Sequence, residues 1–103
     1  MRELSEIRRE IDGIDAELVA LFVRRMRAVE DVAEAKRASG IAVLDAAREQ
    51  AVLDRAAAIA GADYAAEARE LMTWVMSISR RRQRARLGDA SGGSGRSCAD
   101  SGL

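Results

Sequence analysis

Apolar residues recur at alternating steps of three and four through the first third of this chain, and this pattern constrains the fold most. The series comprises Leu4, Ile7, Ile11, Ile14, Leu18, Leu21, Ala28, Val32 and Ala35. A period of 3.5 residues sustained in this way predicts one long helix over about residues 5–39. At about 1.5 Å per residue the helix spans about 50 Å, too long for a compact monomer of this size. We therefore expect a second chain to supply part of the core.

The long helix is expected to end at Gly40, since glycine readily adopts the left-handed conformation that closes a helix. Lys36 and Arg37 precede it and favour the negative end of the helix dipole. Residues 41–44 are a short apolar connector. A strand is rejected there because the sequence offers no second strand to pair with it.

Two shorter helices are predicted after the connector. Asp45 is a typical N-cap for a helix over about residues 46–60, which Gly61 ends. A third helix is predicted over about residues 64–87. Its expected buried face consists of Leu71, Met72, Trp74, Val75, Met76 and Ile78. The predicted fold is all-α, with three helices per chain in an intertwined helical homodimer.

Length and composition limit what else the chain can be. Its 103 residues suffice for one domain, predicted at residues 1–87, followed by a disordered Gly/Ser-rich tail at 88–103. The formal net charge is zero and aromatic residues number three, which argues against nucleic-acid binding. No apolar run is long enough for a membrane span, and the charged N-terminus does not resemble a signal peptide. We expect a soluble, cytoplasmic protein.

The absence of histidine removes several kinds of catalytic site. Ser–His–Asp and Cys–His mechanisms require the imidazole as a base. The single cysteine, Cys98, lies in the tail, so we expect neither a disulfide nor a metal site. No cofactor is predicted.

Charged residues interrupt the apolar face of the long helix. Arg25 occupies a position that the heptad pattern assigns to the seam, where an unpaired guanidinium is costly. Lys36 follows after three turns, with its Cα about 16 Å away, so both side chains can lean toward one ligand. Arg8 lies about 26 Å from Arg25 along the same helix. Any contribution of Arg8 to that ligand must therefore come from the partner chain. Alone, Arg25 is equally well explained as a snorkelling side chain or a register device.

Polar residues also occupy inward positions of the two shorter helices. Glu49 begins an apolar stripe of the second helix, although a first-turn acid also favours the helix dipole. Arg48 beside it has the unfavourable sign for a helix N-terminus, which suggests a nearby anion. Ser79 and Gln83 continue the apolar stripe of the third helix. We interpret the arginine-rich run at residues 80–86 as a solvated face that complements the helix dipole.

Taken together, these groups predict a pocket for a small, doubly anionic molecule that carries a hydroxyl or an ether oxygen. Over about residues 4–83 their order and spacing resemble the all-helical (AroQ-type) chorismate mutase family. The matching pattern is Leu4-x-x-Ile7-Arg8-x-x-Ile11-Asp12-x-Ile14-Asp15, then Arg25, Lys36, Asp45-x-x-Arg48-Glu49 and Ser79-x-x-x-Gln83. The resemblance implies a dimer with paired first helices and two sites, each with one arginine from the other chain.

The resemblance also implies a role for each site residue. Arg8 of the partner, Arg25 and Lys36 would hold the two carboxylates of chorismate. Lys36 and Gln83 would donate hydrogen bonds to its ether oxygen, and Glu49 would bind the ring hydroxyl. The wall would be completed by Asp45, Arg48 and Ser79. The implied reaction, chorismate to prephenate, is an intramolecular rearrangement that needs no nucleophile, metal or cofactor.

Three alternatives remain open. An isochorismate-pyruvate lyase shares the fold but typically lacks an acid at the position of Glu49. A mutase of 4-amino-4-deoxychorismate is harder to separate, because a carboxylate can bind an amine as well as a hydroxyl. A non-catalytic helical dimerisation or regulatory module would explain the heptads, but not Arg25 in the seam or Gln83 on the third helix.

Overall fold

The computed structural model describes residues 1–40 and 42–88 and consists of three helices in that part of the chain. Helix α1 spans Leu4–Ser39, α2 spans Ala46–Ala60 and α3 spans Ala65–Arg86. The all-helical prediction is confirmed, and each predicted helix agrees with the observed bounds to within one residue. The predicted tail, with Cys98, lies outside the described residues apart from Gly88.

The predicted capping residues lie at the helix boundaries, as expected. Gly40 follows α1 with φ 74° and donates from its N–H to the carbonyl of Arg37 at 3.4 Å. Asp45 caps α2, and its Oδ1 accepts a hydrogen bond from the N–H of Arg48 at 3.0 Å. Gly61 ends α2 with φ 83°. These local interactions explain why the boundaries follow from the sequence.

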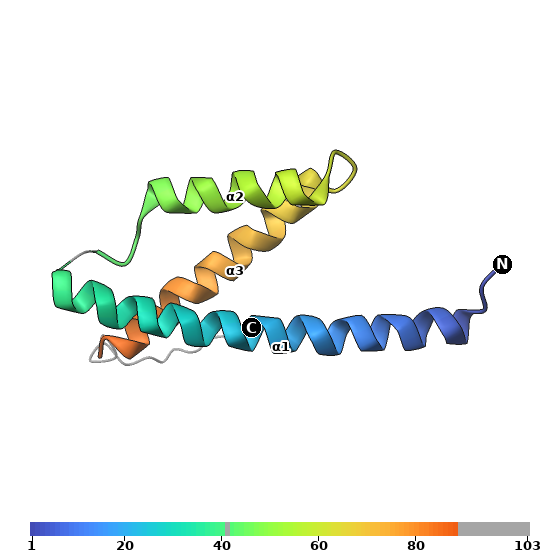
Figure 1. The fold of residues 1–103 in the computed structure, drawn as a ribbon, viewed down its shortest axis with the longest axis horizontal. Helices are drawn as coiled ribbons and strands as arrows, with labels where there is room; N and C mark the ends of the chain where they lie inside the picture. Colours follow the sequence, from blue (N-terminus) through green and yellow to red (C-terminus); the bar gives the residue numbers. More distant parts are fainter. Residues whose placement is uncertain (41, 89–103) are drawn as a thin grey trace.

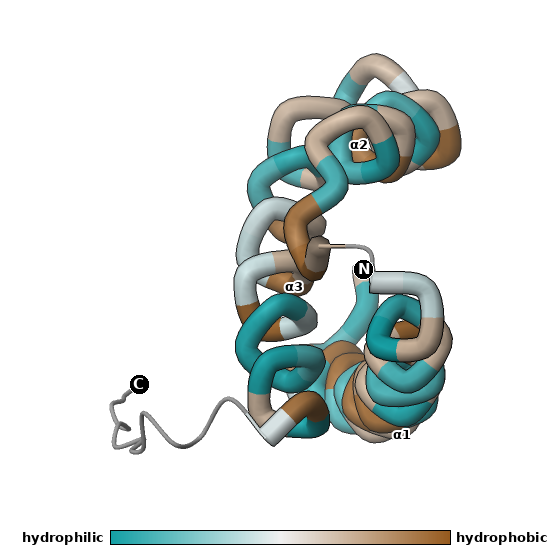
Figure 2. Tube along the Cα trace, turned by 90° about the vertical axis from the view of Figure 1, so that its left-hand side faces the viewer, coloured by the Kyte–Doolittle hydropathy of each residue, from teal (hydrophilic) through white to brown (hydrophobic). Residues whose placement is uncertain are grey.

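Helix α3 connects the other two helices. It packs against both α1 and α2, whereas α1 and α2 make no backbone contact with each other within the described residues. In the view along α1, α3 runs from α2 to α1 along one side of the space between these two helices (Figure 2). The N-terminal end of α1 extends beyond the other helices (Figure 1). The molecule measures 55 × 28 × 20 Å, with a radius of gyration of 16.7 Å against about 13 Å for a compact chain of this length.

Ion pairs tie the C-terminal halves of α1 and α3 together on their exposed side. Arg82 donates to the carboxylate of Glu30, and Arg86 donates from Nε to Oε1 of Glu34 at 2.7 Å. Arg37 donates to the carbonyl of Arg86 at 2.9 Å, near the end of α3. The hydrogen bond from Arg82 lowers the pKa of Glu30. A lowered folded-state pKa means that this stabilisation is present at neutral pH and is lost on acidification.

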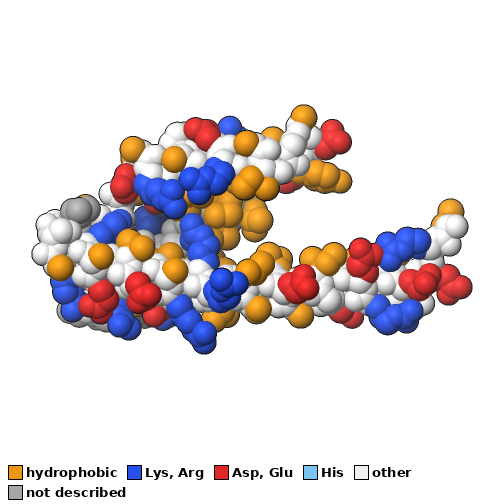
Figure 3. Space-filling model, in the orientation of Figure 1, with side chains coloured by type: hydrophobic (Ala, Val, Ile, Leu, Met, Phe, Trp, Pro, Cys, Tyr) orange, Lys and Arg blue, Asp and Glu red, His pale blue; other side chains and the backbone are white. Residues whose placement is uncertain are grey.

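The hydrophobic core of the single chain is small. Its buried apolar residues are Met26, Ala33 and Met76. The predicted buried face of α3 is therefore wrong in part for this chain, since Leu71 is 52% exposed and Trp74 is 65% exposed. The reason is that this part of α3 is separated from α1 by an apolar gap, which Leu18 and Leu21 line on the side of α1 (Figure 3).

Hydrophilic and hydrophobic residues both occur along each of the three helices (Figure 2). No helix in the described ranges combines the length and the apolar character that crossing a membrane requires.

The left-handed conformation of Gly40 gives a stability prediction. A side chain at φ 74° is strained, so Gly40→Ala should lower the free energy of unfolding by about 1–2 kcal/mol in urea denaturation. Gly13→Ala is the matched control. A Cβ at Gly13 has no atom within 4 Å in this helix interior, so the substitution should raise stability by up to about 1 kcal/mol. Unchanged stability of Gly40→Ala would contradict the observed helix end.

Candidate functional site

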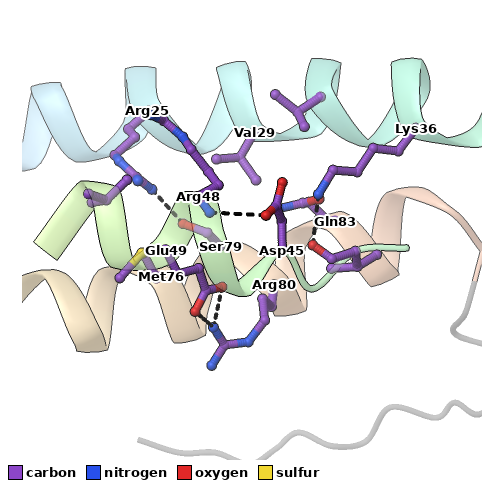
Figure 4. Close-up of a pocket in the computed structure, with 13 residues that line it drawn as sticks. Arg25, Val29, Lys36, Asp45, Arg48, Glu49, Met76, Ser79, Arg80 and Gln83 are labelled. Atoms are coloured by element: carbon purple, nitrogen blue, oxygen red, sulfur yellow. Dashed lines mark hydrogen bonds and ion pairs between the residues drawn. The ribbon is translucent and has the colours of Figure 1, made fainter. Parts of the chain in front are cut away.

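A pocket of about 290 Å³ lies between the C-terminal half of α1, the start of α2 and the C-terminal half of α3. This volume is near the lower end of small-molecule sites. Its apolar lining consists of Val29, Val32, Val43, Val52 and Met76. Its polar lining consists of Arg25, Lys36, Asp45, Arg48, Glu49, Ser79, Arg80 and Gln83 (Figure 4). The structure thus brings together seven of the eight residues that the sequence nominated.

Arg25 is held at the pocket wall by Ser79. Its Nη1 donates to Ser79 Oγ at 2.6 Å, and Ser79 Oγ donates to the carbonyl of Val75 at 2.7 Å. Burial lowers the pKa of Arg25, and the nearby positive charge of Arg48 lowers it further. The folded chain therefore holds this guanidinium at an energetic cost that an anionic ligand would offset.

Lys36 closes the pocket on the side of the connector. It lies in the last turn of α1, and its Nζ donates to the carbonyl of Val43 at 2.7 Å. An ammonium group has three donors, so this bond leaves two of them for a ligand. Arg25 and Lys36 thus reach the same pocket from separate turns of α1, as their spacing predicted.

Glu49 is paired with Arg80, a residue that the sequence analysis did not nominate. Arg80 Nη1 donates to both carboxylate oxygens of Glu49, at 2.7 and 2.6 Å. Both side chains are about three-quarters buried, with exposures of 25% and 26%. The interpretation of the arginine run as a solvated face is therefore wrong for Arg80. Its position four residues after Met76, on the same helix face, was the signal that could have identified it.

Gln83 offers the pocket an uncommitted amide. The side chain is 93% buried at 7% exposure, and its Oε1 has no hydrogen-bond partner in the described chain. A buried polar atom without a partner costs about 1–3 kcal/mol, so such atoms are usually paired by a ligand or by water. The amide can present either a donor or an acceptor to a molecule in the pocket.

Arg8 is the nominated residue that lies outside the pocket. It is exposed near the N-terminal end of α1, which extends beyond the other described helices. This position agrees with the distance argument that Arg8 cannot reach the pocket of its own chain.

The pocket carries an excess of positive charge. Its lining contains four cations, Arg25, Lys36, Arg48 and Arg80, against two carboxylates, Asp45 and Glu49. A net charge of two positive units in a half-enclosed, partly apolar cavity favours a small dianion. Among the described residues, no three cysteine or carboxylate side chains are grouped so that they could hold a metal ion.

Comparison with known proteins agrees with this geometry. The family described as chorismate mutase type II matches residues 7–84, which include every residue that lines the pocket. The chain is 40% identical over 55 residues to a chorismate mutase of Methanocaldococcus jannaschii. That similarity covers 53% of this chain and 56% of the relative, so the chain spans about half the length of the curated relative that it matches. No solved structure matches the chain.

The charge excess predicts dianion binding that depends on Arg25. Malate at ten times its dissociation constant should stabilise the wild-type protein by about 1.4 kcal/mol, visible as a higher melting temperature. Arg25→Leu should lose this response. Without ligand it should melt at the same temperature or higher, because a cation with a lowered pKa destabilises the folded chain. Acetate at equal ionic strength is the control. Equal stabilisation of both proteins by malate would contradict the assignment of this pocket.

Proposed function

We propose that this chain, which belongs to the chorismate mutase type II family, catalyses the rearrangement of chorismate to prephenate. The observation that carries the proposal is the convergence of seven nominated residues on one cationic pocket. This pocket lies wholly within the family match. The proposed enzyme is an isomerase that needs no cofactor, because bonds break and form within a single substrate.

In the proposed complex the two carboxylates of chorismate bind to cations at separate points. Arg25 and Lys36 supply the cations of one chain, and Arg8 of the second chain supplies another. Because Ser79 already orients the Arg25 guanidinium, the site loses little further side-chain entropy when it binds the substrate. Attachment at both ends selects the compact conformer in which the reacting carbon atoms approach each other.

Charge stabilisation accounts for the remaining part of the proposed mechanism. The ether C–O bond breaks as the new C–C bond forms, and negative charge grows on the ether oxygen. The two free donors of Lys36 Nζ and the Nε2 group of the Gln83 amide can donate to that oxygen. Because the surrounding wall is partly apolar, these interactions are stronger than in water. Oriented donors of this kind typically contribute about 10²–10³-fold each.

The other polar residues would define the shape and the polarity of the cavity. Glu49 would accept a hydrogen bond from the ring hydroxyl of chorismate. Asp45 caps α2, which fixes Arg48 and Glu49 in its first turn. A non-catalytic helical module would have no use for a buried Ser79 and Gln83 facing an open cavity, so we favour the enzyme.

We further propose that the active form is an intertwined homodimer with Arg8 contributed across the interface. The support is the exposed apolar surface of the single chain, on both α1 and α3. It surrounds a gap of about 420 Å³ lined by Leu18, Leu21, Phe22, Leu71, Trp74 and Ile78, among others. The N-terminal half of a second α1 has the matching apolar stripe and would bring its own Arg8.

The direct test is the loss of chorismate absorbance in the ultraviolet, with chromatographic identification of the product. Wild-type protein should form prephenate, and Lys36→Ala should lose activity by about 10²-fold or more while it keeps its helical circular dichroism. The 4-amino-4-deoxy analogue is assayed in parallel. Turnover of the analogue alone would support the assignment of the pocket but contradict chorismate as the substrate. If neither compound reacts, the helical module becomes the better interpretation.

Arg8 can be tested by mixing two inactive variants. Arg8→Ala and Lys36→Ala should each be inactive, because each lacks one residue of every site. Refolding them together in equal amounts should restore about a quarter of wild-type activity, since half of the dimers contain one intact site out of two. No recovery in a mixture that forms heterodimers would place Arg8 outside the site.

A further inference from the structure

The ion pair between Arg80 and Glu49 lies in the pocket wall. Arg80 Nη1 is 2.6–2.7 Å from the two carboxylate oxygens, and both side chains line the cavity. The close-up shows the pair joining α2 to α3 beside Met76 and Ser79 (Figure 4). The roles proposed above give Glu49 a contact with substrate but leave Arg80 without a function.

We propose that Arg80 is a positioning residue that makes this site select a ring hydroxyl over a ring ammonium, by neutralising the charge of Glu49. This inference rests on the proposed function, because it concerns the substrate group that Glu49 would contact. It distinguishes chorismate, which has a hydroxyl at that ring carbon, from 4-amino-4-deoxychorismate, which has an amine there.

The selectivity follows from charge. An aliphatic amine is protonated at neutral pH, as lysine is. An unpaired glutamate in a half-buried wall would attract such an ammonium strongly, because Coulomb energies increase as the dielectric constant falls. Paired with Arg80, the glutamate presents a neutral ion pair, and the guanidinium itself repels the ammonium. The pocket therefore offers no net attraction for a cation at this point.

The same pair remains able to bind a hydroxyl. An ionised carboxylate has about four acceptor positions, and Arg80 occupies one on each oxygen. The remaining positions can accept a hydrogen bond from the ring hydroxyl. Because Arg80 fixes the carboxylate between two helices, the acceptor is already oriented when substrate enters.

The experiment compares kcat/KM for chorismate and for the 4-amino analogue in wild-type protein and in Arg80→Met. The variant should shift the ratio of the two values toward the amino analogue by about tenfold or more, because Glu49 regains its full charge. The shift should lie mainly in KM, since this attraction acts equally on bound substrate and transition state. Arg80→Lys keeps the cation and should retain a ratio close to that of wild-type protein.

Arg81→Met is the matched control, since Arg81 is the adjacent arginine, exposed and absent from the pocket lining. It should leave both rates unchanged. If Arg80→Met does not fold by circular dichroism, Arg80→Gln serves the same comparison. A parallel loss of both activities, with an unchanged ratio, would reduce Arg80 to a structural role and overturn the inference. A wild-type protein that converts neither compound would instead overturn the proposed function, so the two failures are distinguishable.

Discussion

The packing of α3 against both other helices is the constraint on which the site depends. Since α1 and α2 make no backbone contact within the described residues, the space between them is open, and α3 forms its wall. Its apolar residue Met76 is buried, and the polar Ser79 and Gln83 follow one and two turns later. The point at which α3 changes from apolar to polar is therefore the point at which the three helices can enclose a charged molecule.

This enclosure imposes an energetic conflict on the unliganded chain. Arg25 is held by a neutral hydroxyl rather than a carboxylate, and both burial and Arg48 lower its pKa. The amide of Gln83 retains an unpaired buried oxygen. These are sites where stability is lost and ligand affinity is gained, because an anion would pair with Arg25 and a hydrogen-bond donor of the ligand would pair with Gln83 Oε1. The conflict is localised, since ion pairs on the opposite side of α1 and α3 hold the two helices together.

Besides the charged pocket, the single chain leaves an apolar surface exposed. Among the described residues, no other helix extends as far as the N-terminal end of α1, and Trp74 lines the gap between α1 and α3. A chain with so small a core requires additional burial to be stable. A second copy would cover this surface and add Arg8 to the pocket, so folding and substrate binding would depend on the same association.

The sequence by itself determined the helices, because their signals are local: the heptads of α1, the Asp45 cap, and the glycines that end α1 and α2. It also nominated seven pocket residues, since polar groups on apolar stripes violate a periodic pattern. Only the tertiary structure decided which charges meet. Arg80 and Glu49 are 31 positions apart on different helices, and the arginine run that contains Arg80 is uniform in sequence. Such pairing depends on how two helices face each other, which no local pattern encodes.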